Sequence, residues 1–99
     1  MADFDVYERT LKLPNALRAG MDYFAAVWED ADHNKELAKH KITMPVLAVG
    51  GRQSIGEGVA HAAEQFAEDI KGTVIDDAGH WLTDEAPETL AGILLDFFQ

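Results

Sequence analysis

The feature that most constrains the fold of this chain is a continuous apolar run, MPVLAVGG, at residues 44–51. A strand with one face in water alternates apolar and polar residues, whereas a continuous apolar strand is buried on both faces, as in a parallel sheet. Pro45 is compatible with the first position of such a strand. We therefore expect a buried parallel strand that is ended by two glycines and followed by a loop at residues 52–58.

A helical pattern and a second strand follow this loop. Apolar side chains recur every three or four residues from Val59 to Ile70, which predicts a helix that Gly72 terminates. A second strand is expected at residues 73–75, and a last apolar helix is expected to open at Pro87. The order strand, helix, strand, helix predicts an α/β fold in which two parallel strands are joined by a right-handed crossover.

The N-terminal part of the chain offers helices and no further strand. Residues 3–10 predict a short helix capped by Asp3, and residues 30–41 predict an irregular polar connector. Between them, residues 14–30 predict a longer helix with one apolar stripe. The stripe consists of Leu17, Met21, Phe24 and Trp28.

The composition limits the partners of the chain. A net charge of −10 over 99 residues argues against nucleic acid or an anionic membrane. There is no cysteine, which excludes disulfides and thiolate chemistry, and the spacing of His33, His40 and His61 matches no metal motif. We expect no metal and no cofactor. The start of the sequence lacks a signal-peptide pattern, and no apolar run approaches the ~20 residues that span a bilayer, so we expect a cytoplasmic protein.

Two parallel strands do not make a stable sheet alone, since parallel sheets have several strands and are covered on both faces. The chain therefore has the pattern of part of a larger protein, or of a protein completed by another copy of itself.

Five short segments, taken in order, resemble one family. The resemblance is to the C-terminal third of the α/β-hydrolase superfamily, closest to the branch of epoxide hydrolases and haloalkane or haloacetate dehalogenases. The segments are NALRAGMDYF (15–24), MPVLAVGG (44–51), AGHW (78–81), EAPE (85–88) and LDFF (95–98). The resemblance implies a partial α/β-hydrolase fold. Residues 1–41 would be the end of the helical cap with its connector, and residues 42–99 the C-terminal part of the core.

His80 is the first candidate for chemistry. It follows the second strand, and in open α/β sheets ligands bind outside the carboxyl ends of the strands. The resemblance implies that His80 is the general base. In the epoxide hydrolase and dehalogenase branch it would direct water onto an ester formed by an aspartate nucleophile, and in esterase branches it would activate a serine.

The groups that His80 would serve are absent from the sequence. There is no Gly-x-Ser/Asp-x-Gly nucleophile turn and no oxyanion-hole loop, so the chain is expected to be inactive alone. The loop at residues 50–56 has no carboxylate. Glu57 is a candidate relay acid, although it also suits the first turn of a helix, and some relatives supply the acid after an earlier strand. Asp76 and Asp77 are interpreted as loop carboxylates.

The resemblance also suggests a pocket for a small apolar substrate. Its candidate residues are Tyr23, Phe24, Trp28 and Trp81, for which ordinary packing is the alternative. Epoxide hydrolases use cap tyrosines to donate to the epoxide oxygen. Phe24 cannot donate, and Tyr23 lies about 100° further round the helix.

Three functional hypotheses remain open. The chain is part of a capped hydrolase of epoxide, haloalkanoate or ester bonds and is completed by a missing N-terminal portion. Alternatively, it is a non-catalytic protein that self-associates as a homo-oligomer, or it is one chain of a split hydrolase.

Overall fold

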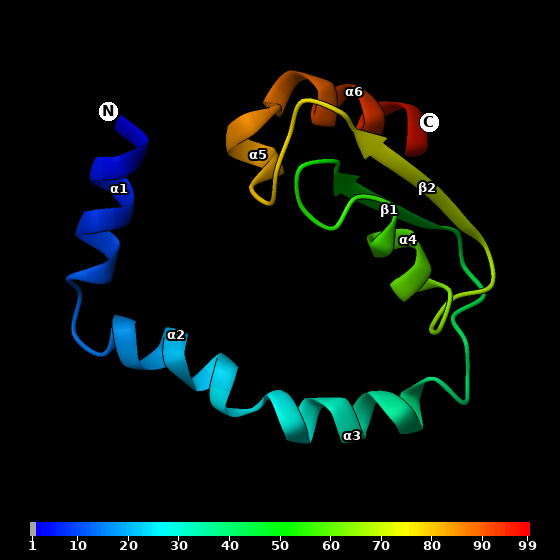
Figure 1. Cartoon of the computed structure of the whole chain (residues 1–99), viewed down its shortest axis with the longest axis horizontal. Coiled ribbons are helices and arrows are strands. Elements are labelled where there is room, and N and C mark those ends of the chain that lie inside the picture. Colours follow the sequence, from blue (N-terminus) through cyan, green and yellow to red (C-terminus); the bar gives the residue numbers. More distant parts are fainter. Residues whose placement is uncertain (1) are drawn as a thin grey trace. The chain divides into compact units, whose positions relative to one another are not determined.

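The computed structural model describes the backbone of residues 2–99 and the side chains of residues 4–99, so the predicted cap at Asp3 lies outside the described side chains. The chain divides into two compact units, Met1–Glu36 and Leu37–Gln99. The first unit is helical, and the second contains the sheet (Figure 1). No helix within residues 2–99 is long and apolar enough to cross a membrane.

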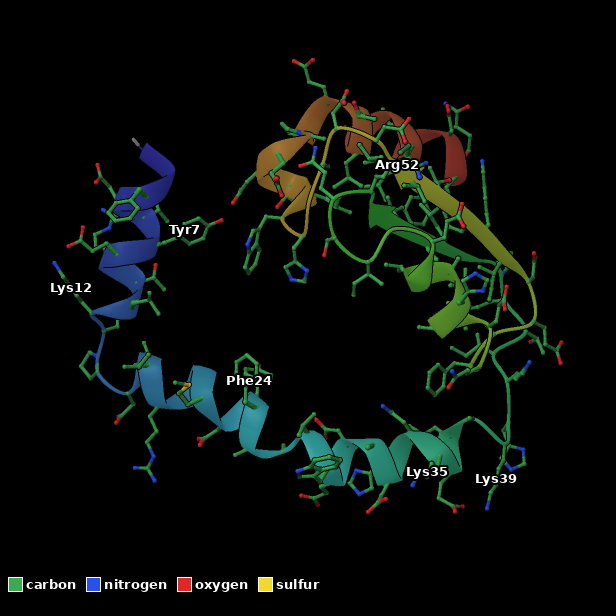
Figure 2. All side chains as sticks on the ribbon, in the orientation of Figure 1. Tyr7, Lys12, Phe24, Lys35, Lys39 and Arg52 are labelled. Carbon is green, nitrogen blue, oxygen red and sulfur yellow. The ribbon has the colours of Figure 1, made fainter. Side chains whose placement is uncertain are left out.

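The first unit is formed by helices α1 (Ala2–Leu11), α2 (Ala16–Ala25) and all but the last residue of α3 (Val27–Leu37). Asn15 joins α1 to α2 in the left-handed conformation, with φ 63°. Asparagine tolerates this conformation better than most residues because its short polar side chain can bond locally. Figure 2 shows Tyr7 projecting from α1 and Phe24 projecting from α2, and both side chains are exposed.

The predicted single helix at residues 14–30 and the predicted irregular connector at residues 30–41 are both wrong. The helix divides at Ala26, where ψ is −1°, far from the value near −42° of a regular helix. Beyond this point α3 continues to Leu37 through the polar segment. Its acidic first turn and basic last turn suit the helix dipole, so the polar composition reflects an exposed helix rather than irregular chain.

In the second unit, β1 (Val46–Gly51) and β2 (Ile70–Ile75) form a parallel pair whose register runs from Val46 opposite Ile70 to Gly51 opposite Ile75. Their arrowheads point the same way in Figure 1. Helix α4 (Gly58–Ala63) connects the strands and contacts both. After β2 come α5 (Leu82–Glu85) and α6 (Pro87–Phe97), the latter opening at the predicted proline.

The connecting helix is shorter than predicted, and Gly72 does not terminate it. Gly72 lies within β2, opposite Ala48, and a Cβ at Gly72 would come within 2.9 Å of the Cβ of Ala60 on α4. The glycine therefore allows α4 to approach the strand closely. Residues 66–69 leave the helical pattern because they pair with Ile42 and with the first residue of β1. Ile42 N–H donates to the Phe66 carbonyl at 2.7 Å, and Val46 N–H donates to the Asp69 carbonyl at 2.8 Å.

The core of the described structure is small. Its buried apolar side chains are Ala48, Ala67, Ile75 and Ala78. No side chain of α2 or α3 is buried, and large apolar side chains of both units are exposed. Within α6, Leu90, Ile93 and Phe97 are half-buried. Two strands and one short crossover helix therefore cover only a little apolar surface.

Candidate functional site

Two loops meet at the carboxyl ends of the strands. The loop after β1 hydrogen-bonds through its backbone to the loop after β2. Arg52 N–H donates to the Ile75 carbonyl at 3.0 Å, and Gln53 N–H donates to the Ala78 carbonyl at 3.1 Å. These bonds extend the parallel pairing beyond the last strand residues, so the segment before His80 is held against the neighbouring loop.

Glycines allow the two loops to approach this closely. A Cβ at Gly51 would lie 2.0 Å from the carbonyl oxygen of Gly79 and 2.6 Å from that of Ala78. A Cβ at Gly50 would lie 2.0 Å from the carbonyl oxygen of Gly56, which has φ 58°. Contacts under 3.0 Å are not tolerated by real side chains, so residues 50 and 51 have to be glycine. The sequence pattern predicts only that this pair ends a strand, and the contact of Gly51 with the His80 loop is not visible in it.

An ion pair joins the same two loops through side chains. The Nε–H of Arg52 donates to Oδ1 of Asp76, and both side chains are largely exposed. Figure 2 labels Arg52 beside the carboxyl end of β2. Because Asp76 accepts this hydrogen bond and carries the opposite charge, the pKa of the Arg52 guanidinium is raised above its ordinary value. Asp76 is thus a loop carboxylate that is paired with Arg52.

His80 lies on the loop that these contacts hold. Its side chain is exposed and lines a hollow of about 150 Å³. The end of β1, Ser54, Ile55 and Leu82 also line this hollow. The imidazole meets the Trp81 ring edge-on, with ring centroids 4.8 Å apart and an interplanar angle of 88°. An exposed imidazole above a small hollow at this edge of the sheet is placed to exchange a proton with water or with a bound molecule.

Glu57 lines a different hollow. It shares that hollow with Arg52, His61 and Asp76. The hollow is lined by residues of α4, of β2 and of the loops that follow the two strands. No carboxylate among the described side chains lines the hollow of His80. The structure therefore brings His80 and Trp81 together and does not bring Glu57 to them; the relay-acid role of Glu57 stays a prediction.

The other candidate pocket residues lie in the first unit. Tyr23, Phe24 and Trp28 are each more than three-quarters exposed on α2 and α3. Trp81, in the second unit, is 66% exposed. A pocket formed by all four residues stays a prediction.

Among the described side chains, those of residues 4–99, no group of three or more histidine, cysteine, aspartate or glutamate residues is arranged to hold a metal ion.

Proteins of known name are similar to this chain in sequence and in structure. No protein-family model matches the sequence. The soluble epoxide hydrolase of Corynebacterium sp. strain C12 is 30% identical over 96 residues, which are 97% of this chain and 33% of that protein. Epoxide hydrolase B of Mycobacterium tuberculosis is 38% identical over 61 residues, which are 57% of this chain and 17% of that protein.

Solved structures show the same fold. The crystal structure of wild-type Cfl2 from Burkholderia cenocepacia superposes with a TM-score of 0.89 at 37% identity and covers 99% of this chain and 34% of that one. The epoxide hydrolase CorEH without ligand gives a TM-score of 0.84 at 30% identity and covers 93% of this chain and 32% of that one.

The chain spans about a third of the length of the Corynebacterium enzyme and of the two solved structures. In sequence and in fold it matches the C-terminal third of α/β-hydrolases of the epoxide hydrolase branch. The comparisons therefore confirm the family resemblance and the partial α/β-hydrolase fold that the sequence predicts. The assignment of residues 1–41 to the cap and residues 42–99 to the core stays a prediction.

Proposed function

We propose that this chain is the part of a capped epoxide-opening α/β-hydrolase that supplies the general base, His80. The observation that carries the proposal is the placement of His80 at the carboxyl edge of the β1–β2 pair, on a loop held by the loop after β1. The epoxide hydrolases among its relatives favour an epoxide over a haloalkanoate or an ester as the substrate.

The reaction requires groups from outside these residues. A carboxylate oxygen of the nucleophile attacks an epoxide carbon, the carbon–oxygen bond of the ring breaks, and the resulting alkoxide takes a proton. His80 then removes a proton from water, and the hydroxide adds to the carbonyl carbon of the ester. Collapse of that adduct breaks its bond to the second diol oxygen, which takes the proton from His80, and the diol is released. The carboxyl group gives its proton back to the donor that protonated the alkoxide, which regenerates the carboxylate. Since no Gly-x-Asp/Ser-x-Gly turn occurs in this sequence, the nucleophile comes from the remaining portion of the enzyme.

The surroundings of His80 favour a small apolar substrate and an external relay acid. Trp81 presents a largely exposed aromatic ring beside the imidazole, which suits an apolar molecule. Tyr23, Phe24 and Trp28 would complete the pocket from the cap side. Because Glu57 lines the hollow of Arg52 instead, a carboxylate after an earlier strand is the favoured orienting group, with Glu57 as the second candidate.

A chimeric enzyme tests this proposal. The matching third of the Corynebacterium soluble epoxide hydrolase is replaced by this chain, and turnover of an epoxide, a haloalkanoate and an ester is measured. The chimera should open the epoxide, and the chain alone should not. His80→Gln should lower the rate of diol formation about 10²–10⁴-fold. The ester intermediate should then accumulate, which is measured as a rapid initial loss of epoxide without formation of diol. Undiminished turnover by His80→Gln would refute the assignment.

The second candidate is a non-catalytic protein that self-associates, and the split hydrolase is a variant of the first proposal. The exposure of large apolar side chains such as Phe4, Leu17, Trp28 and Phe98 favours association with some partner surface. Sedimentation of the chain, first by itself and then mixed with the N-terminal portion of the Corynebacterium enzyme, distinguishes the non-catalytic protein from the hydrolase. A defined homo-oligomer that ignores the N-terminal portion would support the non-catalytic protein, whereas a one-to-one complex with turnover would support the hydrolase. A cytoplasmic location stays a prediction.

A further inference from the structure

We propose that Glu85 is a positioning residue for His80, and that its carboxylate fixes the backbone on both sides of the histidine. The proposal rests on the proposed role of His80 as the base. Glu85 ends α5, and it was part of the EAPE segment that carried the family resemblance, with no role of its own.

The first contact is with the residue after the histidine. Trp81 N–H donates to Oε2 of Glu85 at 2.9 Å. In return, Glu85 N–H donates to the Trp81 carbonyl, also at 2.9 Å. This reciprocal pair is similar to a capping box, in which a side chain of the first turn reaches back to the residue that precedes the helix. Glu85 therefore binds the N–H of the peptide that joins His80 to Trp81 and the carbonyl of the peptide after it.

The second contact is with the residue before the histidine. A Cβ at Gly79 would lie 3.2 Å from Oε1 and 3.2 Å from Oε2 of Glu85, so the carboxylate lies flat against the space that a side chain would occupy. On its other side, the Gly79 carbonyl oxygen abuts Gly51. Gly79 is thus enclosed between the end of β1 and the Glu85 carboxylate.

These contacts determine where the imidazole lies. The edge-on contact of His80 is with the ring of Trp81, whose backbone N–H is bound by Glu85. With Gly79 and Trp81 both fixed, His80 has little backbone freedom, and its ring is held at the hollow beside the end of β1. Small displacements of a catalytic group reduce rates strongly because the reacting atoms have to lie close and aligned. Glu85 acts through the backbone and is therefore a positioning residue rather than a catalytic one.

Kinetics of the chimeric enzyme provide the first test. Glu85→Ala should lower kcat about 10-fold or more and change KM by a smaller factor, because the misplaced base slows the chemical step, whereas loss of the bond to Trp81 loosens only one residue of the proposed substrate pocket. Glu85→Gln should restore most of kcat, since its amide oxygen still accepts from Trp81 N–H. The matched control is Glu88→Ala, which removes an exposed carboxylate from the first turn of α6, in the same hollow as Glu85. Glu88→Ala should leave kcat unchanged.

Hydrogen exchange of the 99-residue chain provides a test that does not depend on activity. Glu85→Ala should speed exchange of the Trp81 amide about 10-fold and leave the amides of β2 unchanged. Gly79→Ala should have a similar effect, because the added methyl pushes the carboxylate away. Gly79 is outside the left-handed region, so the backbone accepts alanine. The double variant should exchange no faster than either single variant, since both remove the same contact.

The outcomes separate this proposal from the proposed function. If His80→Gln abolishes turnover and Glu85→Ala leaves kcat unchanged, only the positioning role is refuted, and Glu85 merely caps α5. If Glu85→Ala and Glu88→Ala lower kcat equally, the effect is one of charge and the proposal is again refuted. If His80→Gln is fully active, the role of His80 itself fails. If the chimera does not turn over, the exchange rate of the Trp81 amide decides, and an unchanged rate refutes the proposal.

Discussion

Gly20 and Gly51 lie in the two units of this chain and have opposite surroundings. A Cβ at Gly20, on α2, would meet nothing within 4 Å, whereas a Cβ at Gly51, at the end of β1, would lie 2.0 Å from the Gly79 carbonyl oxygen. The helical unit leaves space around its side chains, and no residue of α2 is buried. The β unit depends on backbones that approach within contact distance. The second unit therefore contains tertiary structure of its own, and the first contains helices whose apolar side chains are open to a partner.

The largest expected effect comes from Gly51→Ala. The methyl group would overlap two carbonyl oxygens of the His80 loop, which rigid backbone on both sides cannot relieve. We expect loss of cooperative unfolding of the second unit, measured by denaturant titration followed by hydrogen exchange of β1 and β2. An alanine variant with normal protection of both strands would show that the loops do not meet as described.

The next largest effect is expected from Ile75→Ala. Ile75 is 5% exposed, and truncation of a buried isoleucine costs about 2–5 kcal/mol of unfolding free energy. Its matched control in the helical unit is Leu17→Ala, because Leu17 is 63% exposed and should change the unfolding free energy by less than about 0.5 kcal/mol. If Leu17→Ala lowers the unfolding free energy as much as Ile75→Ala, Leu17 is buried against another surface in solution. The proposed contrast between the two units would then be wrong.

Gly20→Ala should act in the opposite direction. Its position is helical, its surroundings are empty, and alanine is more favourable than glycine within a helix by about 0.5–1 kcal/mol. The expected result is increased helicity of the first unit, measured by circular dichroism, with unchanged stability of the second unit. A decrease in helicity would indicate that α2 packs closely against another surface through this face.

The smallest effect is expected from Arg52→Met. Because the ion pair with Asp76 is exposed, screening by salt should remove most of its contribution to stability. A raised arginine pKa means that the stabilisation is complete below the ordinary pKa of arginine and is lost only as the pH rises through the folded-state value. Arg52 therefore adds no pH dependence between about pH 5 and pH 9. A thermal melt in low and in 1 M salt checks this, and a difference that persists in high salt would contradict it.

The sequence pattern predicted the structure correctly where the local sequence is compatible with only one kind of element. The apolar run at residues 44–51 predicted β1, Pro87 marked the start of α6, and the position of His80 after β2 followed from chain order. Pattern failed where alternatives of similar local energy compete. Residues 66–72 have a helical apolar spacing, but the pairing of Ile42 with Ala67 and of β1 with β2 draws them into extended structure. The break at Ala26 has no glycine or proline to signal it.

The sequence alone determined the class of the fold, the order of its elements and the position of His80 after β2, because strand burial, helix starts and loop position depend on residues close together in the chain. Only the tertiary structure decided what holds His80. The contacts of Gly51 with Gly79 and of Arg52 with Asp76 form only when the carboxyl ends of β1 and β2 are side by side, whereas the hydrogen bond from Trp81 N–H to Glu85 lies within one helical turn. A glycine or an arginine in a sequence does not reveal which distant group it will meet, since that depends on the register of the strands.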